Sequence, residues 1–210
     1  MLIRIALLFT ALATVAPAFA QAPSSLPQAA APAPKDGLVP VALDTSLGRI
    51  VVAVDPLHAP VTAGNFLHYV DTHRLDGETF YRALRIAGGE GGLIQGGVRS
   101  DTRKLFPPIA HEPTSRTGLH NVAGSIVMAR LEPGTARGDF FILASDTPSY
   151  DAGAPDGDAD GFAVFGHVVE GMDVVKRILA APTSPTLGEG VMKGQMLDPP
   201  VKIIKAVRVK

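Results

Sequence analysis

Residues 80–97 read FYRALRIAGGEGGLIQGG, and this stretch decides how the rest of the chain is interpreted. Two apolar runs flank a glycine-rich centre, with the cation Arg82 near the start of the stretch and the amide Gln95 near its end. The apolar runs predict one strand over residues 79–85 and another over residues 93–96. The stretch therefore places the cation Arg82 and the amide Gln95 on opposite sides of a loop between strands.

Short β-branched runs separated by turn residues continue through most of the chain. Residues 39–45 and 49–54 flank a Ser-Leu-Gly turn, which predicts a hairpin. Helical spacing of apolar residues predicts two helices, over residues 59–72 and 171–180. Further strands are predicted over residues 125–130, 140–144, 162–169 and 201–209, and a long polar loop over residues 100–117. Because the helices do not alternate with the strands, we expect a mainly β fold, a closed eight-stranded antiparallel β-barrel with two capping helices.

The first 37 residues differ in composition from the rest of the chain. Residues 1–20 combine Arg4, an apolar run and the small-x-small sequence Ala18-Phe19-Ala20, which predicts a cleaved secretory signal peptide. The alternative for this segment is an uncleaved membrane anchor. Residues 21–37 are rich in Pro and Ala and predict a disordered linker. Residues 38–210 are then expected to form one domain.

Composition limits the partners of such an exported domain. The chain has no cysteine, so a disulfide and thiol chemistry are both excluded. From the signal peptide we expect a bacterial periplasmic protein, with the extracellular space as the alternative. A formal net charge of -1 gives no reason to expect nucleic acid as a partner. No second apolar segment is long enough to cross a bilayer, so no membrane span is expected after cleavage of the signal. A monomer is expected.

Five short blocks occur in the order of a known family. Phe80-Tyr81-Arg82 and Leu93-Ile94-Gln95-Gly96-Gly97 are followed by blocks at residues 127–130, 138–142 and 164–173. Together they resemble the Phe-His-Arg, Gln-Gly-Gly, Ser-Met-Ala-Asn, Ser-Gln-Phe-Phe-Ile and Val-Phe-Gly-x-Val-x-Glu-Gly-Met-Asp segments of cyclophilin-type peptidyl-prolyl cis/trans isomerases. The resemblance covers about residues 39–210. It implies the barrel, isomerisation of X-Pro bonds in polypeptide substrates, and no cofactor or metal.

The chemistry of the residues agrees with that activity. A peptide C–N bond resists rotation by about 18–20 kcal/mol because nitrogen shares its lone pair with the carbonyl. A fixed cation that donates to the nitrogen of the twisted amide stabilises the transition state more than the ground state. Arg82 is the candidate for this catalytic role. Gln95 is assigned beside it, to hydrogen-bond either the guanidinium or the substrate backbone.

The resemblance also implies a substrate-binding set. The proline pocket of the family corresponds to Leu93, Phe141 and Phe162, with Met128 and Ala129 beside it. Because Phe140 and Phe141 are adjacent on a strand, they face opposite ways, and Phe141 is assigned to the pocket. The groove for the flanking chain is expected along Ala129 and the Arg130 backbone. The complete predicted set is Phe80, Leu93, Met128, Ala129, Arg130, Asp139, Phe141 and Phe162.

Several residues depart from the family pattern. Tyr81 and Phe162 replace histidines, Asp139 replaces a glutamine and Arg130 an asparagine, and the chain has no tryptophan. These changes bear on substrate preference, rate and drug binding. A non-catalytic peptide-binding chaperone or scaffold on the same fold is therefore kept as the alternative. A hydrolase has little support, because no Gly-x-Ser-x-Gly turn and no cysteine is present.

Two loops have further interpretations. Residues 88–92 form a glycine-rich loop that lacks the Lys-Ser/Thr and the helix start of a phosphate-binding loop, so a rim loop is expected. Residues 156–161, DGDADG, copy the first half of a calcium-binding loop, but His167 stands where the closing acid is needed. A solvated acidic turn is expected there, and no metal is assigned.

Overall fold

The computed structural model describes residues 37–86, 91–99 and 101–210. The predicted signal peptide, the linker up to residue 36 and most of the glycine-rich loop lie outside the described residues. Among the residues that are described, no helix has the length and apolar character needed to cross a membrane.

Strands dominate the described chain, and the helices are few. The strands are β1 (Val39–Thr45), β2 (Gly48–Val54), β3 (Thr79–Arg85), β4 (Gly92–Gly97), β5 (Ser125–Met128), β6 (Asp139–Leu143), β7 (Val164–Glu170), β8 (Thr183–Ser184) and β9 (Met196–Arg208). The helices are α1 (Pro60–Asp71), α2 (Thr114–Thr117) and α3 (Met172–Ala180), with 3-10 turns η1 (Pro148–Tyr150) and η2 (Gly190–Met192).

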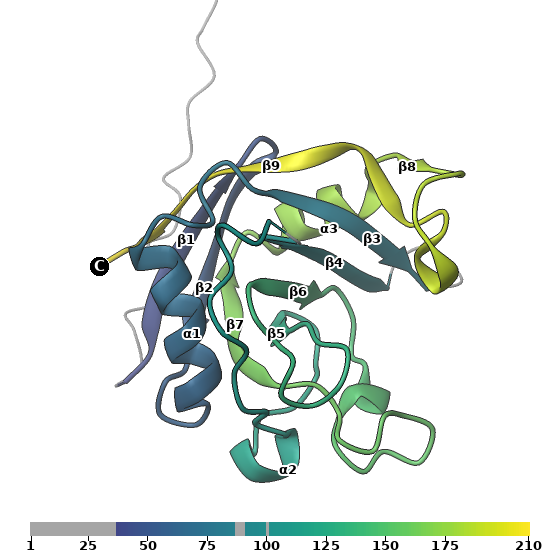
Figure 1. Cartoon of the computed structure of the whole chain (residues 1–210). Coiled ribbons are helices and arrows are strands. Elements are labelled where there is room, and N and C mark those ends of the chain that lie inside the picture. Colours follow the sequence, from purple (N-terminus) through teal and green to yellow (C-terminus); the bar gives the residue numbers. More distant parts are fainter. Residues whose placement is uncertain (1–36, 87–90, 100) are drawn as a thin grey trace, which may run out of the picture. The chain divides into compact units, whose positions relative to one another are not determined.

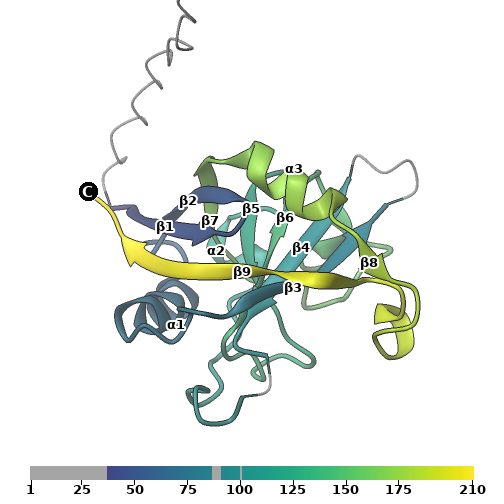
Figure 2. The same cartoon turned by 90° about the horizontal axis from the view of Figure 1, so that it is seen from above.

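Eight of these strands form a closed barrel. Figures 1 and 2 show the arrangement from two directions. Neighbours pair in the order β1-β2-β7-β5-β6-β4-β3-β9, and β9 pairs back with β1 to close the ring. Every pairing is antiparallel, and the two-residue β8 adds to β9 outside the ring. Closure removes the free strand edges, which confirms the predicted eight-stranded barrel.

The two predicted helices pack their apolar faces on the barrel. α1 begins at Pro60; proline lacks a backbone N–H, and the first residue of a helix has no intrahelical acceptor for one. The helix buries Phe66, Leu67 and Val70. The buried carboxylate of Glu112 accepts hydrogen bonds from the backbone N–H groups of Val61 (3.2 Å) and Thr62 (2.7 Å). This carboxylate satisfies donors that a helix start leaves free and complements its positive end.

The second helix and two short elements complete the comparison with the predicted pattern. α3 buries Val174, Val175, Ile178 and Leu179. The structure adds the four-residue α2, inside the segment predicted as a polar loop, and β8, for which the sequence gives no periodic signal. Elements this short have too few residues for a period to show.

Strand alternation divides the apolar residues into two groups. The interior holds Phe66, Phe80, Phe140 and Phe165, with edge contacts between the rings of Phe140 and those of Phe66 (5.3 Å) and Phe80 (5.8 Å). A separate cluster of Leu93, Val127, Phe141, Leu143 and Val164 packs apart from this core, on the other face of the same strands. Successive side chains point to opposite faces of a strand, so the pair at 140 and 141 supplies one ring to each group.

A β-bulge in β3 decides which side chains reach the outer face. Phe80 pairs with Gly96, and Arg82 pairs with Gln95, the residue adjacent to Gly96 in β4. Tyr81 is therefore the extra residue of β3. A bulge interrupts strict alternation. The side chains of Tyr81 and Arg82 therefore both lie on the outer face of the barrel, and that of Phe80 lies in the core. Gly96 is required opposite Phe80, because an added Cβ would lie 2.8 Å from that ring.

Candidate active site

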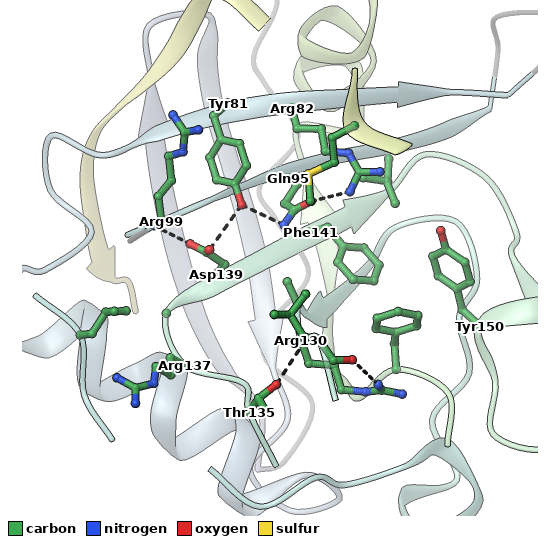
Figure 3. A pocket seen from close by; sticks show the side chains of 17 residues that line it. Tyr81, Arg82, Gln95, Arg99, Arg130, Thr135, Arg137, Asp139, Phe141 and Tyr150 are labelled. Carbon is green, nitrogen blue, oxygen red and sulfur yellow. Dashed lines mark hydrogen bonds between the residues drawn. The ribbon is translucent and has the colours of Figure 1, made fainter. Parts of the chain in front are cut away.

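A hollow of about 370 Å³ lies on the outer face of β3, β4 and β6. Arg82 and Gln95 line it together with Leu93 and Phe141, so the strand pairing brings the two ends of the glycine-rich stretch to one place. Figure 3 shows these side chains, with a polar end at Tyr81, Arg82 and Gln95 and an aromatic end at Phe141 and Tyr150.

The aromatic end consists of three rings in mutual contact. The ring of Phe141 meets those of Phe162 (5.6 Å) and Tyr150 (5.9 Å) edge to face, and the rings of Tyr150 and Phe162 lie 4.9 Å apart. Leu93 and Ala129 complete this part of the wall. Edge-to-face contacts favour fixed ring orientations, so this end offers a shaped apolar surface.

Arg130 holds the Phe162 side of the hollow in place. Its side chain is only 2% exposed, and its guanidinium lies over the ring of Phe162, 4.9 Å from the centroid. Nε and Nη2 donate to the carbonyl of Gly161 at 3.2 and 2.5 Å, and Nη2 also lies 3.0 Å from a carboxylate oxygen of Asp158. Arg130 therefore ties the strand end at Met128 to the acidic turn at residues 156–161.

The polar end is a chain of hydrogen bonds with fixed directions. Nη1 of Arg82 donates to Oε1 of Gln95 (2.8 Å), and Nε2 of Gln95 donates to the hydroxyl of Tyr81 (2.8 Å). The Tyr81 hydroxyl in turn donates to Oδ2 of Asp139 (3.3 Å), whose Oδ1 accepts from the backbone N–H of Arg99 (2.7 Å). These are the interactions drawn between Arg82 and Arg99 in Figure 3. The chain settles which way the Gln95 amide points, with its oxygen toward Arg82.

Burial shifts the pKa of three of these hydrogen-bonded side chains. Desolvation lowers the pKa of Arg82, raises the pKa of Tyr81 and raises the pKa of Asp139. The ordinary pKa of arginine lies far above neutral pH, so Arg82 stays charged there, and Tyr81 stays a neutral donor. The guanidinium has two amide oxygens as partners, from Gln95 and Gln195, and pairs with no carboxylate in the part of the chain that the structure describes.

The predicted residues are not all brought together. Arg82, Gln95, Leu93, Ala129, Arg130, Asp139, Phe141 and Phe162 line the hollow. Phe80 and Met128 do not: the structure corrects their predicted place and puts both in the barrel core, 0% and 3% exposed. The bulge at Tyr81 keeps Phe80 inside, and alternation along β5 turns Met128 inward while Val127 faces the outer cluster.

Other residues of the site carried no sequence signal of their own. Tyr150, from η1, supplies the third ring, and Gln195, from the segment before β9, contacts Arg82. Met192 and Arg99 also line the hollow. Tyr81 lies in a matched block, but the sequence predicted no role for it; its contacts with Gln95 and Asp139 are findings of the structure.

One carboxylate of the acidic turn at residues 156–161 is bound by an arginine of the protein. Asp158 pairs with Arg130, and hydrogen bonding from that guanidinium lowers the pKa of the carboxyl group. Within the described residues, no cluster of three or more histidine, aspartate or glutamate side chains has a metal-binding arrangement.

Comparisons with known proteins bear on the family of the chain. The sequence model of the family described as cyclophilin type peptidyl-prolyl cis-trans isomerase matches residues 40–208. The chain is 38% identical over 147 residues to peptidyl-prolyl cis-trans isomerase A of Dickeya dadantii, which covers 68% of this chain and 72% of that protein. It is 36% identical over 174 residues to a peptidyl-prolyl cis-trans isomerase of Acinetobacter baylyi, with 81% and 85% covered.

Solved structures give the same fold. The crystal structure of a cyclophilin type peptidyl-prolyl cis-trans isomerase from Cryptosporidium parvum superposes with a TM-score of 0.63 at 18% identity, covering 82% of this chain and 98% of that one. The structure of the same Cryptosporidium parvum protein in the presence of the dipeptide Ala-Pro superposes with a TM-score of 0.61. At this identity the likeness concerns the fold alone. The sequence match over residues 40–208, together with the two bacterial relatives, shows that the chain belongs to the cyclophilin-type peptidyl-prolyl cis-trans isomerase family.

Proposed function

We propose that this protein accelerates rotation about X-Pro bonds in exported polypeptide chains and so assists their folding. The observation that carries the proposal is the charged guanidinium of Arg82 at the edge of an aromatic hollow, held by amide oxygens. A proline ring is a compact apolar group, and the surface formed by Phe141, Phe162 and Tyr150 suits it.

The mechanism requires no nucleophile, metal or cofactor. With the proline ring on the aromatic surface, Arg82 lies beside it and donates to the prolyl nitrogen as the amide twists and that nitrogen regains its lone pair. In the planar ground state this lone pair is shared with the carbonyl, so the interaction is stronger in the transition state. A rate gain of five decades needs about 7 kcal/mol, and one charge-assisted donor at a desolvated site supplies about 3–4 kcal/mol of it. The remainder is assigned to holding the ring and the flanking chain.

The export part of the proposal is supported by the sequence of residues 1–20, with its positive start, apolar run and Ala18-Phe19-Ala20. The absence of cysteine is compatible with an oxidising compartment. A periplasmic monomer is the proposed form. Mass spectrometry of protein recovered from a periplasmic fraction tests this, because cleavage after Ala20 gives a mature chain that begins at Gln21. Recovery of only the full-length chain from membranes would reject it.

The activity is tested with a proline peptide in a protease-free isomerisation assay, such as exchange NMR. Wild-type protein is expected to raise the cis–trans exchange rate far above that in buffer. Arg82→Ala is expected to lower kcat/KM by about 10²–10³-fold, the usual effect of removing one preorganised donor. The variant also removes the donor to Oε1 of the buried Gln95, so the thermal midpoint is measured alongside to separate lost stability from lost catalysis. Wild-type protein that binds the peptide without accelerating exchange would support a peptide-binding chaperone instead.

A further inference from the structure

Arg82 is held from two sides, and the second side comes from a distant part of the chain. Gln95 accepts from Nη1, and Gln195, 113 residues away, accepts from Nε at 2.8 Å. Within the described residues, Nη2 of Arg82 donates to no protein acceptor. Nη2, with the second N–H of Nη1, is therefore the part of the guanidinium left for a substrate.

The side chain of Gln195 is itself fixed in one orientation. Its Nε2 donates to the carbonyl of Val191 at 2.7 Å, and an amide that donates there presents its oxygen to Arg82. This contact is what distinguishes the two ends of the amide. Gln195 and Gln95 thus both turn their oxygen atoms toward one guanidinium.

The backbone around Gln195 is held independently of its side chain. The N–H of Ala83, next to Arg82, donates to the carbonyl of Gln195 at 2.9 Å, and the N–H of Gln195 donates to the carbonyl of Met192 at 3.0 Å. Both bonds use backbone atoms and are available to any residue at position 195 except proline. The amide is therefore not needed to keep this segment against β3.

Neutral acceptors have a specific consequence for a cation. A carboxylate in either position would hold the guanidinium as firmly, but it would cancel much of the charge that the twisted amide needs. An amide oxygen orients the group through its dipole and leaves the net charge in place. Two amides on two different nitrogens also prevent rotation about the last side-chain bonds of Arg82, so no ordering cost remains at the moment of reaction.

We propose that Gln195 is a positioning residue of the isomerase: its neutral amide oxygen fixes the Nε side of Arg82, opposite Gln95, and directs Nη2 to the substrate with the charge undiminished. Gln195 does not line the hollow, so it acts through Arg82 and not on the peptide. The inference rests on the proposed isomerase function.

Three variants separate positioning from a structural role. Gln195→Met keeps the length of the side chain without an acceptor, and Gln195→Glu keeps an acceptor but adds negative charge. Val191→Ala is the matched control, because Val191 is 83% exposed and contributes only its backbone oxygen to the contact. The measurements are the cis–trans exchange rate of bound peptide, the peptide dissociation constant, the thermal midpoint and the solvent exchange of the Arg82 Nε–H in the NMR spectrum.

The expected pattern is specific. Gln195→Met should slow exchange of the bound peptide about tenfold, the usual worth of one hydrogen bond to a charged group, and expose the Nε–H to solvent. Gln195→Glu should keep the Nε–H protected, because a carboxylate oxygen still accepts from it, and still be about tenfold slow; it also loses the donor to the Val191 carbonyl, so its thermal midpoint is compared with that of Gln195→Met. Peptide affinity should stay within twofold in both variants, and Val191→Ala should match wild type throughout.

Each other result has one meaning. An inactive wild-type protein rejects the proposed function itself. An active wild-type protein with Gln195→Met within twofold of its rate rejects the role of Gln195 alone. Full activity of Gln195→Glu also rejects it, because a purely structural contact is satisfied by a carboxylate oxygen.

Discussion

Replacing Arg130 by methionine tests how the aromatic end of the hollow is held. Methionine keeps the apolar stem of the side chain and removes the guanidinium. The Arg130 side chain is 2% exposed. Its guanidinium donates twice to the carbonyl of Gly161 and once to that of Leu131 (2.8 Å), and it lies over the ring of Phe162. The change therefore leaves two carbonyl groups without these donors and removes one cation–π contact.

The cost follows from those contacts. A buried carbonyl left without a donor costs about 1–3 kcal/mol, and the cation–π contact adds about 0.5–1 kcal/mol. The ion pair to Asp158 adds little, because the side chain of Asp158 is 40% exposed and water replaces the arginine there. The free energy of unfolding should fall by about 3 kcal/mol, which lowers the thermal midpoint by roughly 6–12 °C for a domain of this size.

The assay is thermal unfolding followed by circular dichroism, with peptide titration by NMR as the second measurement. Peptide affinity should weaken because Phe162 loses its support, while the exchange rate of bound peptide, set at Arg82, should stay close to wild type. Arg103→Met is the matched control, because Arg103 is 88% exposed and pairs only with Asp101; its midpoint should not move. Equal midpoints for the two arginine variants would refute the reasoning.

Two further changes test the backbone and the buried acid. Asp139→Asn should gain stability relative to wild type as pH rises above the ordinary aspartate pKa: burial raises the pKa of Asp139, so the folded state holds the proton more tightly and wild type loses stability over that range. Urea unfolding at several pH values checks this. If the unfolding free energy of the variant minus that of wild type falls or stays constant with rising pH, the prediction is contradicted. Gly97→Ala should destabilise the protein by more than about 3 kcal/mol, because Gly97 has φ +132° and an added Cβ would lie 2.3 Å from the carbonyl oxygen of Gly138. Gly118→Ala, at φ +70° with open space, is the control, and equal losses in the thermal midpoint would show that the clash is not the cause.

The local pattern of the sequence was sufficient for most of the barrel. β3 occupies the predicted residues, the first hairpin turns at the predicted glycine, and both long helices begin and end within a residue of their predicted bounds. Alternation along β6 also separated Phe140 from Phe141 correctly, one in the core and one in the outer cluster. These features depend on residues that are close in sequence, so spacing and turn residues reveal them.

The same alternation failed where a strand departs from it. The bulge at Tyr81 shifts the register between β3 and β4, so Phe80 lies inside and does not reach the hollow. A bulge depends on how two strands pair and leaves no mark in the spacing of one of them. Met128 was placed in the pocket by resemblance alone, and its strand turns it into the core.

The sequence by itself determined the barrel, its family and the choice of Arg82 and Gln95 as candidates, because each depends on residues that lie near one another or in blocks of fixed order; that Gln95 binds the guanidinium is a finding of the structure. Only the tertiary structure decided what surrounds that pair: Gln195 behind the guanidinium, Arg130 under Phe162, and Tyr150 as the third ring. Which side chains distant in sequence come into contact depends on how the loops pack against the barrel. A guanidinium or an amide accepts many partners, and only packing selects one of them.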